Sequence, residues 1–100
     1  MGRAERAKPA RLAEKLLGIR TALNLTAEEM IKRLDYPALP LHRASITEYE
    51  KGRREPPLLI LFQYARAANI FLEVLVDDSL DLPEVIPSKE KSLGIAKKDL

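Results

Sequence analysis

The chain has 100 residues, 46% hydrophobic and 32% charged, which is enough for one modest core and too short for two. It contains no cysteine, which excludes a disulfide framework, a thiol nucleophile and a cysteine-based zinc site. The formal net charge is only +2, but residues 1–54 carry twelve lysines and arginines against seven acids, whereas residues 55–100 carry five against eight. This asymmetry fits a half that faces a polyanion, although on charge alone an uneven solvated surface is the simpler explanation.

The start of the chain, MGRAERAKPARL, is charged and lacks an apolar stretch, so we expect no signal peptide. No apolar run approaches the length needed to cross a bilayer, and we expect a cytoplasmic protein. We divide the chain into a flexible N-terminal arm (1–8), a helical domain (9–76) and a C-terminal tail (77–100).

Two amphipathic helices are predicted first. Residues 9–23 form a helix with Pro9 in its first turn and Asn24 beyond its end, because apolar residues recur at helical spacing: Leu12, Leu16, Ile19 and Leu23. Thr26 is a good N-cap, and Glu29 completes a capping box that opens a second helix. That helix ends before Pro37, and the segment DYPALP (35–40) is predicted to be a turn or loop.

Three further helices follow. The third runs from about His42 to Lys51, with Gly52 as the residue that ends it. The fourth begins after Pro57 and ends at Asn69, and its core-facing residues are predicted to be Leu58, Leu61, Tyr64, Ala65 and Ala68. A short fifth helix over 72–76 would contribute Leu72, Leu75 and Val76. The tail from Asp77 is polar and proline-punctuated, so we expect either disorder or an extended strip, Leu80 to Ile86, packed on a neighbour.

From Thr26 the chain reads TAEEMIKRL, then a turn, then RASITEYEKGRREPPLLILFQYARAANIFLEVL. Over about residues 11–76 this order resembles the Cro/repressor-type, or XRE-like, helix-turn-helix family. The residues that carry the resemblance are Glu28, Glu29, Met30, Ile46, Glu50, Gly52, Pro56, Leu61, Tyr64, Ala65 and Leu75. It implies an all-α fold, a compact five-helix lambda-repressor-like domain with an extended C-terminal tail. It also implies that the third helix enters the major groove of DNA.

Two departures from the family pattern bear on function. Ala27 stands where the family usually has a glutamine that contacts backbone or base, so that contact is not expected here. The turn between the second and third helices is also longer than in the family. The extra residues, 35–40, either touch DNA or serve as a connector, and a connector is favoured because surface loops tolerate insertions.

The resemblance implies that DNA-binding residues lie on and beside the third helix. Arg43 is the best candidate for direct readout, because its guanidinium can bond guanine O6 and N7, and otherwise it is a solvated arginine at a helix start. Thr26 would meet a phosphate at a helix N-terminus or act as a cap alone, and the two arginines after Gly52 would run beside the backbone. The full candidate set is Thr26, Lys32, His42, Arg43, Ala44, Ser45, Thr47, Arg53 and Arg54.

Two glutamates are expected to have structural roles. The resemblance implies that Glu50 pairs with Arg20, late in the first helix, and ties the first helix to the third. Glu48 is expected to pair locally with Lys51 or Arg43. His42 is the only histidine, and without cysteines or clustered acids it makes a poor metal site. We therefore expect no metal, no cofactor and no enzymatic activity.

An interaction surface is predicted from surplus apolar residues in the second half of the domain. Some of Leu59, Ile60, Phe62 and Phe71 should face outward, because other residues already serve the core. We expect them to form a homodimer interface together with the tail, through Leu80, Leu82, Val85 and Ile86, unless the tail or the 35–40 segment covers them.

Two functions are compatible with these features. The first is a sequence-specific, double-stranded-DNA-binding transcriptional regulator that acts as a homodimer by operator occupancy. The alternative is a protein-interaction module, such as an antitoxin-like partner or a small accessory subunit with a helix-turn-helix fold. Arg43, Arg53 and Arg54 favour the first, and Ala27 with the longer turn favours the second.

Overall fold

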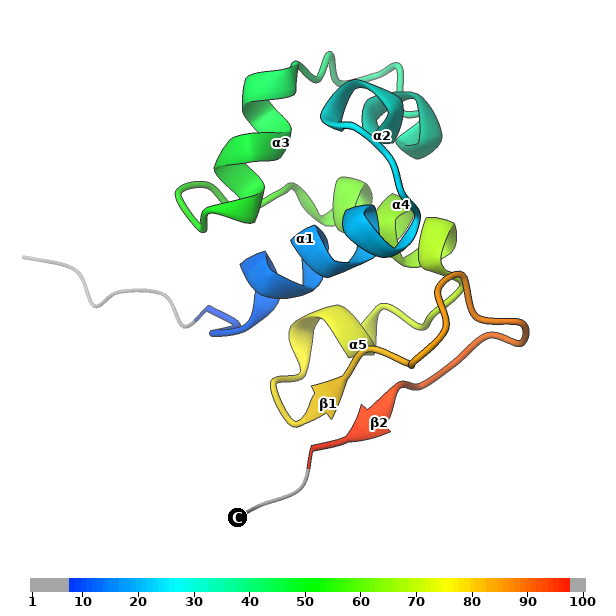
Figure 1. Ribbon diagram of the computed structural model, residues 1–100. Coiled ribbons are helices and arrows are strands. Elements are labelled where there is room, and N and C mark those ends of the chain that lie inside the picture. The colour runs from blue at the N-terminus through cyan, green and yellow to red at the C-terminus, as the bar shows by residue number, and fades with distance from the viewer. Residues whose placement is uncertain (1–7, 98–100) are drawn as a thin grey trace, which may run out of the picture.

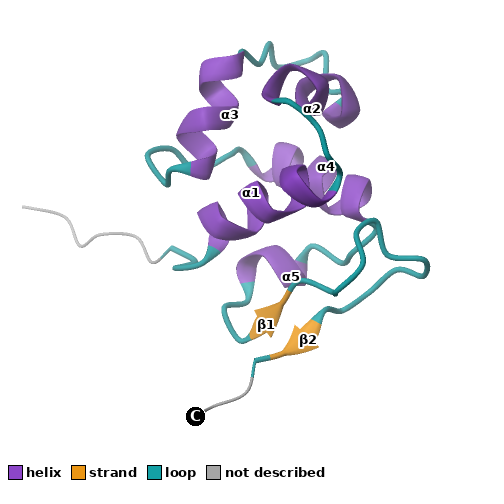
Figure 2. Cartoon of the chain, viewed as in Figure 1, coloured by secondary structure: helices purple, strands orange, loops and turns teal. Residues whose placement is uncertain are grey.

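The computed structural model describes residues 8–97, so that 1–7, most of the predicted arm, and 98–100 lie outside the described residues. Within residues 8–97 the chain forms five helices: α1 (Leu12–Ala22), α2 (Ala27–Leu34), α3 (Arg43–Glu50), α4 (Leu58–Ala68) and α5 (Glu73–Val76). Two strands of two residues, β1 (Leu80–Asp81) and β2 (Ile95–Ala96), pair antiparallel in the tail. The predicted helical fold is confirmed, with this small sheet added below α5 (Figure 1, Figure 2).

One hydrophobic core holds the helices together around α1. Helix α1 lies between the α2–α3 pair and α5 and contacts α3, α4 and α5 (Figure 1). Its stripe, Leu12, Leu16 and Ile19, is buried as predicted. The rest of the core comes from every other helix and from the α4–α5 turn: Met30, Leu34, Ile46, Tyr49, Ile60, Leu61, Tyr64, Ala65, Ala68, Ile70, Val74 and Leu75. Burial of this apolar surface is the main source of stability.

Some predicted side-chain directions in α4 and α5 are wrong. Leu58 is 64% exposed, although the helical spacing predicts that it faces the core, and Val76, which the fifth helix is expected to contribute with Leu72 and Leu75, is 41% exposed. Ile60, assigned to the outward-facing set, is fully buried. The helical period explains the exchange in α4, because Ile60 lies one turn before the buried Tyr64, on the same face. Ile60 therefore belongs to the core and cannot take part in a dimer interface.

The predicted helix ends are confirmed wherever a local signal marks them. Asn24, Gly52 and Asn69 end α1, α3 and α4, respectively. All three adopt the left-handed backbone conformation, with φ angles of 59°, 73° and 56°. The start of α1 differs, because it begins at Leu12 rather than Pro9. The N–H groups of Ala10 and Arg11 donate to the carboxylate of Asp78, 2.9 and 3.1 Å away. A cap from the tail, some 67 residues distant, therefore fixes where α1 begins.

The tail packs against its own chain over residues 77–97. Leu80, Leu82 and Ile86 are partly buried against the core, which corrects the expectation that this strip is disordered or packs on a neighbour. Backbone bonds join Ser88 N–H to the Ala68 carbonyl at 3.0 Å and Phe71 N–H to the Ser92 carbonyl at 2.9 Å. These contacts leave Val85 as the exposed member of the predicted tail interface, at 68%.

Lys15 is the buried charged residue of the described chain, with only 2% of its surface exposed. Its Nζ donates to the carbonyls of Val74 at 2.7 Å and Asp77 at 2.9 Å, at the end of α5. Burial, together with the nearby Arg11 guanidinium, lowers the pKa of Lys15. The ammonium thus satisfies the Val74 carbonyl at the end of the short helix, and it is a second donor to the Asp77 carbonyl, which also accepts from Leu80 N–H at 3.0 Å.

We expect Lys15→Met to destabilise the protein by about 1–3 kcal/mol, because the Val74 carbonyl would lose its Lys15 donor while remaining buried, and the Asp77 carbonyl would keep only its bond from Leu80 N–H. Chemical denaturation followed by circular dichroism measures this. Lys32→Met on the exposed surface of α2 is the control, and it should change the free energy of unfolding by less than about 0.5 kcal/mol. Equal stability of the Lys15 and Lys32 variants would contradict the assigned role.

Candidate nucleic-acid interface

Helix α3 is fixed to the domain by its inner face. Ile46 and Tyr49 are buried, and Glu50 accepts two hydrogen bonds from Arg20 of α1, at 2.6 Å to Nε and 2.9 Å to Nη2. Arg20 also donates to the Leu25 carbonyl at 2.9 Å, in the turn before α2. The predicted Arg20–Glu50 pair is therefore present, and it joins α1, the α1–α2 turn and α3. A rigidly held α3 leaves its opposite face available to a ligand.

The outer face at the start of α3 combines most of the predicted reading residues. His42, Arg43, Ala44 and Thr47 are all exposed and line one surface hollow together with Ala27 and Glu48. Because Ala27 is small, the side of α2 that faces this hollow is open. A base edge could approach these side chains without displacing a larger residue.

Two hydroxyl groups of α3 are already engaged within the helix. Ser45 Oγ accepts from His42 N–H at 3.2 Å, so this half-buried side chain caps the start of the helix. Thr47 Oγ1 donates to the Arg43 carbonyl at 3.3 Å but remains exposed. Of these two residues, Thr47 is therefore better placed to meet DNA.

The N-terminus of α2 carries the predicted capping box. Thr26 Oγ1 accepts from Glu29 N–H at 3.1 Å, and Glu29 Oε1 accepts from Thr26 N–H at 2.8 Å. This backbone bond lowers the pKa of Glu29, so the group that engages the Thr26 N–H is a stable carboxylate. The Thr26 hydroxyl is exposed and can still donate to a phosphate, whereas its N–H is already used.

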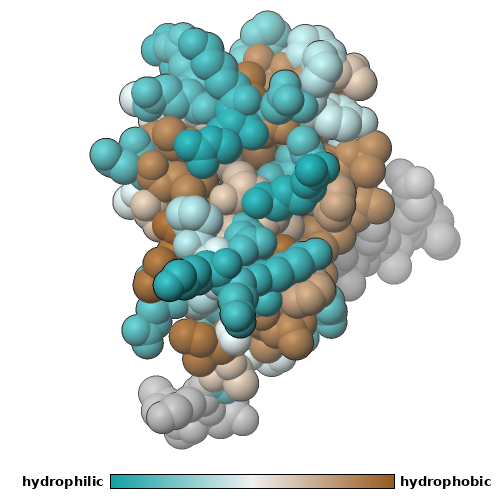
Figure 3. All heavy atoms as spheres, turned by 90° about the vertical axis from the view of Figure 1, so that its right-hand side faces the viewer, coloured by the Kyte–Doolittle hydropathy of each residue, from teal (hydrophilic) through white to brown (hydrophobic). Residues whose placement is uncertain are grey.

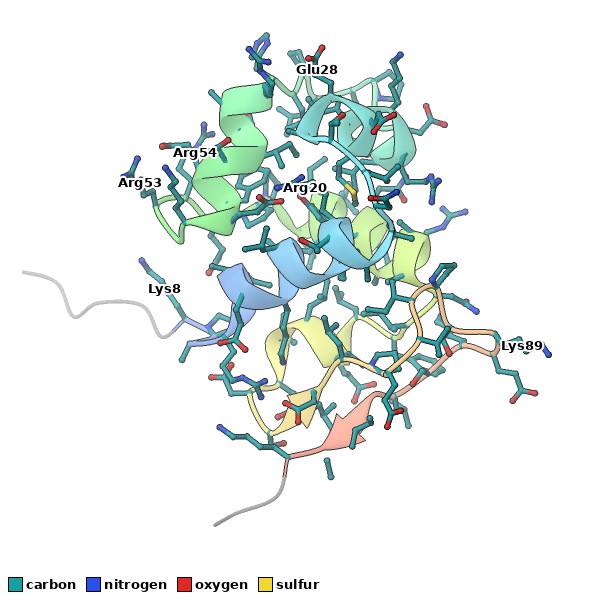
Figure 4. All side chains as sticks on the ribbon, viewed as in Figure 1. Lys8, Arg20, Glu28, Arg53, Arg54 and Lys89 are labelled. Atoms are coloured by element: carbon teal, nitrogen blue, oxygen red, sulfur yellow. The ribbon has the colours of Figure 1, made fainter. Side chains whose placement is uncertain are left out.

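The other end of α3 closes in a Schellman motif around Gly52. Gly52 N–H donates to the Tyr49 carbonyl at 3.2 Å, and Arg53 N–H donates to the Glu48 carbonyl at 3.0 Å. Arg53 and Arg54 follow directly and are exposed. Figure 4 shows both on the side of the molecule that carries α3, with Lys8 below them.

Two acidic residues accompany the candidate arginines. Arg43 Nη1 lies 3.6 Å from Glu28 Oε1, and both side chains are more than 70% exposed. Arg53 Nη1 lies 3.6 Å from Glu48 Oε2, which corrects the expectation that Glu48 pairs with Lys51 or Arg43. Exposed pairs of this kind contribute about 0–1 kcal/mol, so a phosphate or a base can replace the carboxylate at little cost.

Lys32 is separate from the other candidates. It lines surface hollows beside the 35–41 loop, with Asp35 and Tyr36, and none of the residues at the start of α3 lines these hollows. Tyr36 and Leu39 of this loop are half-buried, and Leu39 N–H bonds to the Tyr36 carbonyl at 3.3 Å. The structure therefore leaves Lys32 apart from the candidate residues at the start of α3, which line a different hollow.

Sequence reasoning missed two residues of this surface. Glu28 was used only as a family marker, but it lies beside Arg43. Lys8 was assigned to a flexible arm, but it lines a cavity with Arg53 and Arg54. No sequence signal reveals either neighbour, because the contacts join segments that are 15 and about 45 residues apart.

Within residues 8–97, no group of three or more His, Asp or Glu side chains has an arrangement that could hold a metal ion. No helix in this part of the chain combines the length and apolar character that a membrane span requires.

The arrangement defines a helix-turn-helix domain, in which α2 and α3 are paired and α3 presents an exposed face. A helix-turn-helix family model matches residues 12–74, from the first residue of α1 into α5. The comparisons with curated proteins and with solved structures gave no match. The chain belongs to the helix-turn-helix family of Cro/repressor (XRE) type. This is a family of DNA-binding transcriptional regulators, which are generally not enzymes.

Proposed function

We propose that the protein is a sequence-specific regulator of transcription that binds double-stranded DNA as a homodimer and acts by occupying an operator. Helix α3 lies in the major groove, with Arg43 bonding a base edge and Ala44 and Thr47 beside it. Arg53, Arg54 and the Thr26 hydroxyl contact phosphates on either side. Lys32, which lies apart, is left without a role in base recognition.

One observation supports this proposal above all others. The face of α3 that bears His42, Arg43, Ala44 and Thr47 is exposed, while its opposite face is held by buried Ile46 and Tyr49 and by the Arg20–Glu50 pair. Groups that read bases must be held rigidly, since a loosely held side chain loses orientation and selectivity. Helix α3 combines a fixed inner face with an unobstructed outer one.

Binding to a library of genomic DNA fragments at several salt concentrations tests specificity. We expect a small set of fragments to be retained as the salt rises, because base contacts resist counterion competition better than phosphate contacts alone. Uniform weak retention of all fragments, disappearing together as salt rises, would contradict sequence-specific regulation.

The homodimer is proposed to form through the α4 patch, defined by Leu58, Leu59 and Phe62. These side chains are 64%, 53% and 42% exposed and share one side of α4, and Phe71 follows at 37%. On the face shown in Figure 3, hydrophobic areas reach the surface between hydrophilic side chains. A two-fold dimer suits this function because two copies of α3 would match half-sites about 34–36 Å apart.

Leu59→Glu is expected to shift the dimer to monomer, because it places a carboxylate without a partner in an apolar interface. The cost of about 3 kcal/mol or more corresponds to an increase of roughly 100-fold in the dimer Kd. Analytical ultracentrifugation over a range of concentrations measures it. Leu17→Glu, 41% exposed on α1, is the matched control and should leave the dimer intact. If the Leu59→Glu variant still forms the dimer, the α4 patch is not the dimer interface.

The alternative of a protein-interaction module has less support from the structure. Its antitoxin-like form uses the tail to wrap another protein, whereas residues 77–97 pack on their own helices. Co-purification of a second protein at fixed stoichiometry would favour the alternative.

A further inference from the structure

We propose that Lys8 joins Arg53 and Arg54 in a phosphate-binding cleft that grips the DNA backbone, and that Asp78 positions Lys8 for this contact. The inference rests on the proposed function only in taking DNA as the ligand, and it does not require sequence specificity. It adds a binding residue before α1 and a positioning residue in the tail.

The cleft is formed by two segments that are distant in the sequence. A cavity of about 170 Å³ lies between residues 8–13 and residues 52–56, and its lining includes Lys8, Arg53 and Arg54. Because one water occupies about 30 Å³ of liquid, this cavity has room for several waters or for one phosphodiester oxyanion. Figure 4 shows the three side chains on the same side of the molecule, next to the end of α3.

The charges at the cleft favour an anion. Neither Lys8 nor Arg54 forms an ion pair within residues 8–97, and Arg53 has only the 3.6 Å surface pair with Glu48. Glu55 also lines the cavity, so the described part of the lining carries three cations and one carboxylate. Cations in excess of acids repel one another, and a phosphate relieves this repulsion while it releases counterions from DNA.

Asp78 determines where the segment before α1 lies. Its Oδ2 accepts from Ala10 N–H at 2.9 Å and its Oδ1 from Arg11 N–H at 3.1 Å, and these bonds lower the pKa of Asp78. The Arg11 guanidinium donates in turn to the Asp78 carbonyl at 3.0 Å. Lys8, which lines the cleft, therefore lies two residues before a point of the backbone that is tied to the tail.

The salt dependence of DNA binding tests the role of Lys8. With fluorescence anisotropy on a labelled duplex, Lys8→Ala should reduce the log–log salt slope by about 0.9, as expected for one lost phosphate contact. Over a fourfold rise in salt, the wild-type affinity should then fall about 3.5-fold further than that of the variant. Lys89→Ala removes the same charge on the opposite side of the molecule (Figure 4) and should leave the slope unchanged.

Asp78→Ala separates positioning from simple charge. Removing a carboxylate from a DNA-binding protein should strengthen binding if only the overall charge matters. We expect the opposite: a loss of affinity, a slope close to that of Lys8→Ala, and little further effect when both changes are combined. Thermal melting curves, recorded before the binding assay, establish that the variant is folded at the assay temperature. If Asp78→Ala does unfold, Lys8→Ala and Lys89→Ala alone decide on the cleft.

The outcomes distinguish the two proposals. If Lys8→Ala reduces the salt slope of DNA binding but the protein prefers no genomic fragment, the phosphate-binding cleft is supported and the sequence-specific regulator is rejected. A specific site whose salt slope is unaffected by Lys8→Ala would reject the cleft alone. Lys8-dependent binding of inorganic phosphate, with no change in the DNA slope, would assign the cleft to a free anion and overturn the proposal.

Discussion

Glu50→Ala is expected to lower the free energy of unfolding by about 3 kcal/mol, the lower end of the cost of breaking a buried ion pair. The change leaves the Arg20 guanidinium without its two carboxylate oxygens at 2.6 and 2.9 Å. Glu50 is only 9% exposed and Arg20 23%, so water replaces the lost bonds poorly. For a domain of this size each kcal/mol corresponds to about 4–8 °C in Tm, so thermal melting detects the loss easily.

Glu48→Ala provides the matched control on the same helix. Glu48 also pairs with an arginine, but at 3.6 Å and with an exposed partner, and such surface pairs contribute about 0–1 kcal/mol. The two substitutions therefore remove the same chemical group from neighbouring positions that differ in burial. Similar costs for both would mean that the Arg20–Glu50 pair does not hold α3 to α1.

Arg43→Ala is expected to abolish base discrimination at one position of the bound site, with a loss of about 1–3 kcal/mol, or roughly 5- to 150-fold in affinity for the preferred sequence. Affinity for unrelated DNA should fall far less, because phosphate contacts by other cations remain. Titrations of the preferred duplex and of duplexes with single base changes measure both quantities. If the variant keeps the base preference of the wild type, Arg43 does not contact a base.

Arg43→Lys distinguishes base readout from simple attraction. Lysine retains the positive charge but lacks the planar fork that bonds guanine O6 and N7 together. If Arg43 reads a base, the lysine variant should lose most of the discrimination while keeping most of the affinity for unrelated DNA. If Arg43 contacts a phosphate instead, the lysine variant should behave like the wild type.

The parts of the fold that depend on local chemistry could be predicted. A capping box specifies α2, because Thr26 and Glu29 satisfy each other's backbone N–H groups within one turn. Gly52 ends α3 because a residue without Cβ adopts a positive φ at no steric cost. The Arg20–Glu50 pair could be predicted only through the family resemblance, since the two residues are 30 positions apart.

The parts that depend on packing between distant segments could not be predicted. Ile60 and Leu58 are equally apolar neighbours in the sequence, yet Ile60 is buried and Leu58 is 64% exposed. Which face of α4 is buried depends on where α1, α2 and α5 lie. The spacing of apolar residues in the sequence shows how wide the apolar face of a helix is. It locates the boundary of that face on the helix less precisely.

The sequence by itself determined five helices, the capping box of α2, the residues that end α1, α3 and α4, the arginines at both ends of α3 and membership of a DNA-binding family. Only the tertiary structure decided that the tail folds back, that Asp78 caps α1 and that Lys8 lies with Arg53 and Arg54. Helical spacing and capping act over a few residues, so one stretch of chain specifies them. Contacts across 40–70 residues exist only after the core has formed, because the core alone sets the relative positions of those segments.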